Sequence, residues 1–174
     1  MRVLILGSGA REHALAWKFS RSNRLSGLFV APGNAGTNTL GENLPGVDPN
    51  DPESVVGACV ERKIQLVFVG PEVPLSLGVV DALKAEGINA IGPPQASAQL
   101  ESSKEFSKRF MAEHGIPTAA FHTYHSGDEL EQGVRNADYP VVVKKSGLAA
   151  GKGVIESDDT DALVAAGRTF IESG

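Results

Sequence analysis

Four short strand-like segments, each followed by a turn rich in glycine or proline, most constrain the fold of this chain. They comprise residues 3–6, 28–31, 66–69 and 89–91, and helical patterns separate them. The first three are continuous apolar runs, which are typical of strands covered on both faces. Strands that alternate with helices predict a doubly wound parallel α/β sheet, which we expect over residues 1 to about 93.

Three helices are predicted between these strands. The first places Leu15 and Phe19 on its core face, at i and i+4. The second begins after the N-cap Asp51, has proline at its first position and runs to Arg62. The third is expected over residues 74–86, where glycine follows as a stop signal.

Composition limits the class of protein. Hydrophobic residues make up 41% of the 174 residues and charged residues 21%, as in ordinary soluble globular proteins. The formal net charge of −5 gives no general reason to bind nucleic acid or an anionic membrane. Cys59 is the sole cysteine, so no intrachain disulfide can form, and we expect a packing role for it and a cytoplasmic protein. The apolar N-terminal run is too short for a signal peptide or a membrane span.

The glycine-rich turn after the first strand is a candidate phosphate-binding turn. Gly7 and Gly9 flank it, and backbone N–H groups at the start of the following helix can hold phosphate. A dinucleotide fingerprint requires glycine at position 12, where Glu12 instead places a carboxylate that repels a pyrophosphate. The second strand also lacks the acidic residue that would hold a ribose. The sequence therefore disfavours NAD, and glycines that serve only close strand–helix packing remain an alternative.

Two further polar turns follow strands of the same predicted sheet. Residues 32–39 include amide and hydroxyl side chains that suit a sugar or a phosphate, and residues 70–72 follow the third strand. The carboxyl ends of parallel strands meet at one edge, where open α/β sheets bind ligands. We therefore expect these turns to line one site.

The pattern after the sheet predicts a helical connection. Residues 96–115 read as a helix in two pieces, with Phe106, Phe110 and Met111 as core candidates. We expect the first domain over residues 1–100 and the connection over residues 101–120.

Residues 121–174 are expected to form a second, α+β domain. Residues 121–124 read as a strand, on which His122 and His125 would point to opposite faces, so a shared metal ion is not expected. Ser126 and Glu129 make a capping box for a helix to about Asn136. A last helix after residue 158 carries Leu163, Ala166 and Phe170. About 54 residues are few for an independent core, so we expect an incomplete domain.

The densest chemistry lies in residues 139–157. A β-branched run leads into the glycine-rich loop of residues 147–153, and an apolar pair leads away, which predicts a β-hairpin. Glycines allow close approach to an anion, and Lys144, Lys145 and Lys152 add positive charge, so phosphate is the expected ligand. A solvated surface hairpin is the alternative.

This loop does not fit the P-loop pattern. Only three residues separate Gly147 from Gly151, and Gly153 stands where a magnesium-binding hydroxyl would be required. The P-loop also opens a helix, whereas an apolar strand-like pair follows here.

Five blocks of the sequence together resemble the phosphoribosylamine–glycine ligase family. They are GSGAREHALAWK from Gly7, APGNAGT from Ala31, GPE from Gly70, QLESSK from Gln99 and SGLAAGKGV from Ser146. The blocks follow the family's order along the whole chain, which makes the resemblance more specific than any single glycine pattern.

The resemblance implies an ATP-grasp ligase of purine biosynthesis that uses ATP and Mg²⁺. Such enzymes phosphorylate the carboxylate of glycine, and the amine of 5-phosphoribosylamine attacks the resulting glycyl phosphate to give glycinamide ribonucleotide. The N-terminal sheet domain is then expected to hold the phosphoribosyl substrate. By motif position the candidate substrate-binding residues are Gly9, Arg11, Asn34, Gly36, Thr37, Pro71 and Glu72.

The resemblance also implies which residues bind ATP. A lysine before the small domain and another on its first hairpin contact the phosphates, and a glycine loop closes over them. The corresponding residues are Lys104, Lys144, Gly147, Gly151, Lys152 and Gly153. Lys145 departs from the small residue usual in the family, and neighbouring residues on a strand face opposite ways, so only one of Lys144 and Lys145 is expected to bind phosphate.

Members of this family are more than twice as long as this chain. Their magnesium ligands, their adenine pocket and most of their glycine site lie beyond residue 174, so the sequence predicts an N-terminal piece that is inactive alone. A non-catalytic phosphoribosyl-binding module is the alternative. Small molecules are the expected partners, with no nucleic acid or membrane, and homo-oligomerisation stays open.

Overall fold

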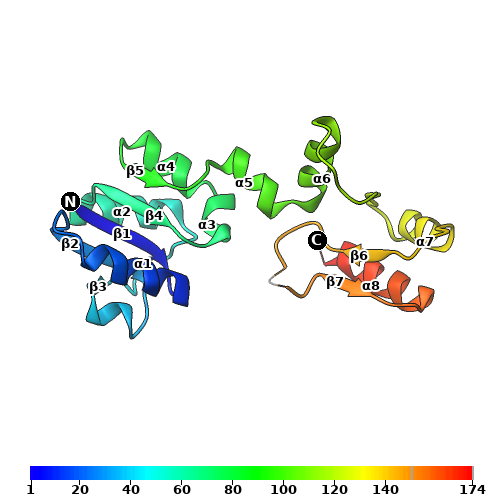
Figure 1. Ribbon diagram of the computed structural model, residues 1–174, viewed down its shortest axis with the longest axis horizontal. Helices are drawn as coiled ribbons and strands as arrows, with labels where there is room; N and C mark the ends of the chain where they lie inside the picture. The colour runs from blue at the N-terminus through cyan, green and yellow to red at the C-terminus, as the bar shows by residue number, and fades with distance from the viewer. Residues whose placement is uncertain (150, 174) are drawn as a thin grey trace. The chain divides into compact units, whose positions relative to one another are not determined.

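The computed structural model of the chain describes residues 1–149 and 151–173, and it forms two compact units (Figure 1). The first unit is Met1–Gln99 and the second extends from Leu100 onward. Residue 150, within the predicted loop of residues 147–153, lies outside the described residues. Each unit has its own hydrophobic core, and the predicted helical connection of residues 101–120 falls within the second unit.

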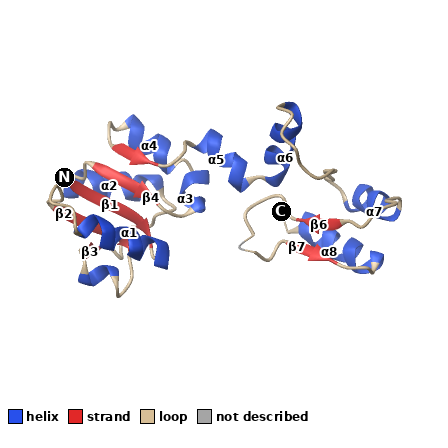
Figure 2. Ribbon diagram, viewed as in Figure 1, coloured by secondary structure: helices blue, strands red, loops and turns tan. Residues whose placement is uncertain are grey.

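The first unit is built on a parallel five-stranded sheet with strand order β3-β2-β1-β4-β5 (Figure 2). Four of these strands were predicted, and the short β3 was not, because its two residues carry no apolar pattern and pair only with Phe29 and Val30 of β2. The sheet confirms the predicted doubly wound parallel fold. Its strands are β1 (Arg2–Gly7), β2 (Gly27–Pro32), β3 (Glu42–Asn43), β4 (Leu66–Val69) and β5 (Asn89–Ile91).

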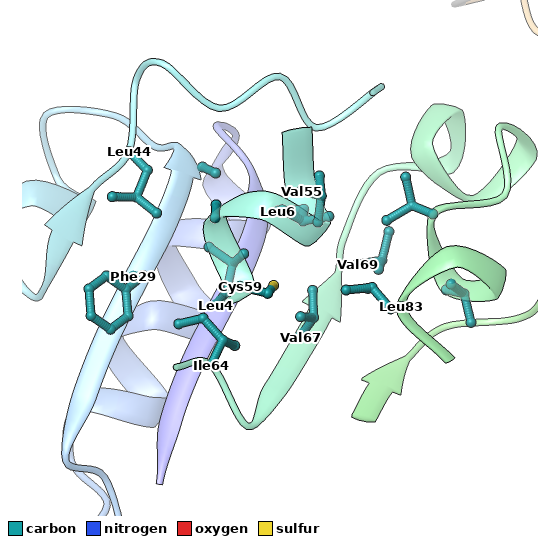
Figure 3. Close-up of a cluster of buried hydrophobic side chains, with 14 residues drawn as sticks. Leu4, Leu6, Phe29, Leu44, Val55, Cys59, Ile64, Val67, Val69 and Leu83 are labelled. Carbon is teal, nitrogen blue, oxygen red and sulfur yellow. The ribbon is translucent and has the colours of Figure 1, made fainter. Parts of the chain in front are cut away.

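Helices cover both faces of this sheet. Side chains alternate along β1, so Leu4 and Leu6 face the core under α2 and α4, which Figure 3 shows in close-up. Val3 and Ile5 face the other core, where α1 packs with Leu15 and Phe19 partly buried, as predicted. The helical elements of this unit are α1 (Ala10–Ser20), η1 (Thr37–Thr39), α2 (Pro52–Arg62), α3 (Glu72–Ser76), α4 (Val79–Ala85) and α5 (Gln95–Ser102), which reaches into the second unit.

Helix α2 begins and ends where the sequence predicts. Asp51 is the N-cap, and its carboxylate accepts a hydrogen bond of 3.0 Å from the backbone N–H of Glu53. Pro52 occupies the first helical position, where the missing N–H has no intrahelical partner in any case. The cap and the proline are thus local signals for this end of the helix, and Val55 of its first turn also packs in the core.

The single helix predicted over residues 74–86 is wrong, because the chain forms two helices there. Helix α3 ends at Ser76, and Gly78 has a φ of 83°, in the left-handed region that an α-helix cannot include. The break lets α4 begin a new direction and bury Val79, Val80 and Leu83 against the sheet. Apolar periodicity continues across the break, which is why the sequence does not show it.

In the second unit, two of the helices pack beside a β-hairpin. Strands β6 (Val142–Lys144) and β7 (Val154–Glu156) pair antiparallel, which confirms the predicted strand–loop–strand. The helices of this unit are α6 (Lys104–Glu113), α7 (Gly127–Arg135) and α8 (Thr160–Glu172). Its core consists of Leu130, Val134, Val143, Leu163 and Val164.

Most of the predicted helix starts in this unit are confirmed. Ser126 caps α7, since its hydroxyl accepts from the backbone N–H of Glu129. The Glu129 carboxylate, however, accepts from the N–H of His125 rather than from that of the cap residue, so the predicted capping box is only half formed. Asp159 caps α8 by accepting from two backbone N–H groups of its first turn.

Two predictions for this unit are wrong. Residues 121–124 form no strand, and of their side chains Tyr124 packs on the core of the unit while His122 stays exposed. Phe106, Phe110 and Met111 are not core residues, because α6 buries none of its side chains. The aromatic rings of α6 pack along the helix itself, with Phe106 and Phe110 stacked at 6.4 Å between centroids. Periodicity identifies an apolar face but not whether another element covers it.

Across residues 1–149 and 151–173, none of the helices combines the length and the apolar character that crossing a membrane requires.

Cys59 offers a chemical test of the first core. Burial raises the pKa of its thiol to about 12, and the side chain is 1% exposed. We expect the native chain to resist the thiol reagent DTNB at pH 8 and to react when urea unfolds the first unit, because the thiolate is the nucleophile. Rapid reaction of the native chain would contradict this packing.

The same pKa shift predicts how stability depends on pH. Because the folded pKa of about 12 exceeds the ordinary value of 9.0, this thiol stabilises the fold fully below about pH 9. Its contribution should decline as the pH rises from there toward 12. Urea unfolding of a Cys59→Ala variant, which lacks the ionisable group, should show a smaller decline over that range.

Candidate functional site

The loops after β2, β1 and β4 meet at one edge of the first sheet, as the sequence predicts. These strands are neighbours in the sheet, and backbone hydrogen bonds of 3.3 Å run from Gly33 N–H to the Gly7 carbonyl and from Gly70 N–H to the Leu6 carbonyl. All seven candidate substrate residues lie on these loops or on the first turns of the helices that follow them. The fold thus gathers residues that are up to 63 positions apart in the chain, from Gly9 to Glu72.

A buried carboxylate lies at the centre of this edge. Glu12, in the first turn of α1, accepts a hydrogen bond of 2.7 Å from the backbone N–H of Gly9 through Oε2 and is only 3% exposed. Its other oxygen, Oε1, has no hydrogen-bond partner among the described residues. The Nε of Arg11 lies 3.3 Å from Oε1 as an ion pair, but the geometry is not that of a hydrogen bond.

Two strand ends need glycine because of this carboxylate. A Cβ on Gly7 would lie 2.7 Å from Cγ of Glu12, and a Cβ on Gly70 would overlap Oε1 of Glu12. The side chain of Glu12 therefore fills the space between the ends of β1 and β4. This placement gives the sequence argument against NAD a physical basis, since a carboxylate occupies the place of the pyrophosphate.

The loop after β2 is held by its own polar side chains. Thr37 is fully buried, its hydroxyl accepts from the Asn34 N–H at 2.8 Å, and its own N–H donates to the Asn34 side-chain oxygen at 2.9 Å. The Asn34 amide also donates to the Ser8 carbonyl at 2.8 Å, which ties this loop to the turn after β1. Asn43 of β3 donates to the Asn34 carbonyl at 2.7 Å. Asn34 and Thr37 thus stabilise the conformation of this loop through hydrogen bonds within it.

The remaining candidates differ in exposure. Gly9, Arg11 and Glu72 are exposed, whereas Gly36 and Pro71 are partly buried. The ring of His13 packs directly on Gly36, so a side chain at position 36 would require that exposed ring to move. The sequence reasoning did not single out His13 or Asn43, because only the fold brings them to the loop. A direct role of the seven candidates in binding remains a prediction.

The second unit contains a cleft of about 890 Å³. Its walls come from the start of α6, the segment of residues 119–125, strand β6 and the C-terminal part of α8. Lys104, Lys108, Lys144 and Lys145 line it together with apolar side chains such as Val141 and Phe170. A cleft with several ammonium groups and an apolar floor suits an anionic ligand that also carries an apolar ring.

The start of α6 is fastened to the beginning of the glycine-rich loop. Lys104 N–H donates to the Ser146 carbonyl at 2.9 Å, and Glu105 N–H donates to the Ser146 hydroxyl at 3.1 Å. The Nζ of Lys104 donates to the Gly147 carbonyl at 3.0 Å. These bonds bring Lys104 beside the loop although 43 positions separate Lys104 from Gly147. The sequence identified Lys104 and Gly147 but gave no sign of Ser146 as the anchor.

Lys144 and Lys145 both line the cleft, but their ammonium groups have different surroundings. The Nζ of Lys145 donates to the Ser173 hydroxyl at 3.0 Å, close to the C-terminal end of α8, where a positive charge is favourable. Lys144 is exposed and has no hydrogen-bond partner for its Nζ within residues 1–149 and 151–173. Lys144 is therefore the better placed of the two to meet a ligand phosphate.

The glycines of the loop lie in different settings. Gly147 lines the cleft, whereas Gly151, Lys152 and Gly153 are not among the described residues that line it. Gly151 has a φ of 79°, and a Cβ on Gly153 would lie 2.6 Å from the Cβ of Ala149. Gly153 is thus required for packing within the hairpin, while contact of these three residues with ATP remains a prediction.

Ion pairs join α7 to α8 in this unit. Glu131 accepts from Arg168 and from Arg135 at 2.8 Å each, and Arg168 also donates to Asp128 at 2.8 Å. The hydrogen bond from Arg168, followed by that from Arg135, lowers the pKa of Glu131. These groups are exposed or only partly buried, so the ion pairs contribute little to stability, and we assign them no reactive role.

No group of three or more His, Cys, Asp or Glu side chains that could hold a metal ion occurs within the described part of the chain.

Two models of known protein families match consecutive parts of the chain. The model for phosphoribosylglycinamide synthetase, N domain, matches residues 1–101. The model for phosphoribosylglycinamide synthetase, ATP-grasp (A) domain, matches residues 102–173. The change from one model to the next falls within two residues of the boundary between the compact units.

Individual proteins of this kind are similar in sequence. A phosphoribosylamine–glycine ligase from Ralstonia nicotianae is 49% identical over 156 residues, which cover 89% of the chain and 36% of that protein. The trifunctional purine biosynthetic protein adenosine-3 of Gallus gallus is 47% identical over 162 residues, covering 92% of the chain and 16% of that protein. The chain thus spans little more than a third of the first relative.

A solved structure agrees with this similarity. The crystal structure of phosphoribosylamine–glycine ligase from Thermotoga maritima is 34% identical and superposes with a TM-score of 0.74, covering 95% of the chain and 38% of that protein.

The contact between Glu12 and Gly70 can be tested by substitution. We expect Gly70→Ala to destabilise the first unit by about 1–3 kcal/mol, because the new methyl group would overlap the Glu12 carboxylate and lie 3.0 Å from the Leu6 carbonyl. Urea unfolding measures this change. Gly57→Ala is the matched control in α2, where a Cβ meets nothing within 4 Å and alanine should stabilise by about 0.5–1 kcal/mol. Equal effects of both substitutions would contradict the contact.

Proposed function

The chain belongs to the phosphoribosylglycinamide synthetase family, and on that premise we propose that it is part of a ligase that joins glycine to 5-phosphoribosylamine. The observation that carries the proposal is the succession of the two family models along one chain, over residues 1–101 and then 102–173. The reaction would consume ATP and give glycinamide ribonucleotide, an intermediate of purine biosynthesis.

The first unit supplies the proposed phosphoribosyl site. Its exposed candidates are Gly9, Arg11 and Glu72, at the edge where open α/β sheets bind ligands. Arg11 offers a guanidinium and Glu72 a carboxylate, while Gly9 has no side chain and would let a ligand approach the backbone closely. Asn34 and Thr37 would hold the loop that carries Gly36, since their polar groups bond within it. Pro71 would fix the backbone at the start of α3. A guanidinium suits a sugar phosphate, and a carboxylate suits its hydroxyl groups.

The second unit supplies the proposed triphosphate site. Lys104 and Lys144 line one cleft, and Lys104 is already fixed to the loop through the Gly147 carbonyl. Two ammonium groups on a cleft wall fit a polyphosphate, because each offsets charge that grows on the departing phosphate. Gly151, Lys152 and Gly153 would follow on the part of the loop that covers it.

The proposed chemistry has two steps. A carboxylate oxygen of glycine attacks the γ-phosphorus of ATP and releases ADP, and the amine of phosphoribosylamine then attacks the acyl carbon and releases phosphate. When bound, Mg²⁺ would offset charge on the phosphate oxygens. The described residues of this chain would bind and orient the phosphates, and we predict that the magnesium ligands lie elsewhere in the longer ligase. We also predict a cytoplasmic protein whose partners are these small molecules.

A phosphoribosyl-binding module without catalysis is the second candidate. Two observations favour it. The N-domain family model covers the first unit, and that unit has a hydrophobic core on each face of its sheet. Calorimetry with the full-length protein separates the two candidates. Binding of both glycinamide ribonucleotide and ATP would favour the ligase, and binding of glycinamide ribonucleotide without ATP would favour the module. In this chain alone, binding of glycinamide ribonucleotide but not ATP would mean that the first domain is complete and the second is not.

Growth provides a test of the ligase itself. The complete reading frame that contains this sequence should restore growth without purines to a bacterial strain that lacks phosphoribosylamine–glycine ligase. Failure of a well-expressed full-length protein to do so would overturn the proposal.

Of the four lysines that line the cleft, Lys104 and Lys144 should contribute more to ATP use than Lys145. In the full-length ligase we expect Lys104→Gln and Lys144→Gln each to weaken ATP use about tenfold, the loss of one charged hydrogen bond. Lys145→Gln should change it by less than about twofold, because that side chain bonds to Ser173. Lys84→Gln on α4 is the surface control. The measurement is kcat/KM for ATP from ADP release, and a Lys145 effect equal to that of Lys144 would contradict the assignment.

The purified 174-residue chain alone should not catalyse ligation. It spans 36% of the length of its Ralstonia relative, and phosphoryl transfer needs a bound metal ion and a glycine site in addition to the phosphate site. The assay follows ADP release with phosphoribosylamine generated in place. Release that requires both glycine and phosphoribosylamine would contradict this expectation.

A further inference from the structure

Glu12 carries a buried oxygen that lacks a donor. The residue is 3% exposed, and no described residue donates a hydrogen bond to Oε1. Buried polar atoms in folded proteins are nearly always paired, so an unpaired carboxylate oxygen at a ligand-binding edge requires an explanation. The proposed function assigns no role to Glu12.

The carboxylate occupies the N-terminus of α1, a helix of 11 residues. Free N–H groups at such a terminus form a favourable site for an anion. Here Oε2 of Glu12 already accepts from the Gly9 N–H at 2.7 Å, and the side chain fills the space between Gly7 and Gly70. A ligand phosphate placed there would meet a like charge. The phosphate must therefore be held by another group.

Arg11 is the nearest cation to this carboxylate. Its Nε lies 3.3 Å from Oε1, and its side chain is 65% exposed. A guanidinium presents its donors in a planar fork, so an Nε that faces Glu12 leaves the two terminal nitrogens free to take a phosphate in two parallel hydrogen bonds.

We propose that Glu12 is a positioning residue, which orients the guanidinium of Arg11 so that its terminal nitrogens hold the phosphate of the sugar-phosphate ligand. The inference rests on the proposed function, which puts the phosphoribosyl substrate at this edge. In the complex the Nε–H of Arg11 donates to Oε1, so the unpaired oxygen gains its partner when the ligand binds. Glu12 itself remains buried and does not touch the ligand.

The direction in which one substitution changes the affinity for a phosphate distinguishes this positioning role from simple charge repulsion. Glu12→Gln removes a negative charge close to the ligand anion. If charge repulsion were its only effect, the variant would bind a phosphate more tightly. It also replaces Oε1, the acceptor for the Nε–H of Arg11, by an amide NH₂ group, which cannot accept a hydrogen bond. If Glu12 orients Arg11, the variant therefore binds the phosphate more weakly. The variant can keep the Gly9 hydrogen bond through its amide oxygen and has nearly the same volume, so the fold should be retained.

The experiment is a double-mutant cycle with ribose 5-phosphate and glycinamide ribonucleotide as probes, measured by calorimetry. We expect Glu12→Gln to weaken both probes about tenfold, the loss of one charged hydrogen bond, and Arg11→Ala to weaken them at least as much. In the Arg11→Ala background, Glu12→Gln should cause no further loss. Glu53→Gln, an exposed first-turn carboxylate of α2, is the matched control and should change affinity by less than about twofold.

A second readout follows Arg11 directly. The Nε–H resonance of Arg11 should sharpen and shift when glycinamide ribonucleotide binds to the unsubstituted chain, and it should not do so in Glu12→Gln. Tighter binding by Glu12→Gln, or losses that add fully in the double variant, would overturn the positioning role while leaving the phosphoribosyl site in place. Absence of binding of either probe to the unsubstituted chain would overturn the site itself and this inference with it.

Discussion

The packing of one carboxylate against two strand ends organises the edge of the first sheet where the loops after β1, β2 and β4 meet. Glu12 cannot occupy the gap between β1 and β4 unless Gly7 and Gly70 lack side chains, and it stays there because the Gly9 N–H bonds to it. An open α/β sheet normally leaves this gap to a ligand. Here the protein fills it, which is why we propose a ligand site further out, on the exposed side of Arg11 and on the loops after β2 and β4.

Local signals in the sequence were sufficient for most of the first unit. Buried apolar runs identify four strands, and an N-cap followed by proline fixes the start of α2, since these effects act within a few residues. The errors occur where distant contacts decide. The break at Gly78 lets α4 reach the sheet, and the short β3 exists only because it pairs with β2. Likewise, the apolar face of α6 is visible in the sequence, but its exposure depends on what packs there.

In the candidate sites, too, local sequence patterns identify some features, and others depend on contacts between distant residues. Motif spacing identified the loops, yet it could not tell side chains that face a ligand from those that hold a loop in shape. Asn34 and Thr37 look like ligand-binding residues in the sequence, and the fold uses their polar groups inside the loop. In the second unit, strand alternation predicted that Lys144 and Lys145 face opposite ways, but both line the cleft and strand β6 ends at Lys144. What distinguishes them is the bond from Lys145 to Ser173, a contact 28 residues away that no local pattern could show.

The proposed phosphate role of the loop of residues 147–153 depends on anchoring more than on its glycine content. Glycines give a loop freedom, which by itself lowers affinity because that freedom is lost when a ligand binds. The hairpin limits this loss at both ends. Helix α6 holds Ser146 and Gly147, and the Gly153 carbonyl accepts from the Lys145 N–H at 2.8 Å. Lys104 is itself fixed beside the first anchor through the Gly147 carbonyl. For the proposed phosphate site, these anchors reduce the freedom that binding would have to remove, and the same number of glycines in an unanchored hairpin would not do so.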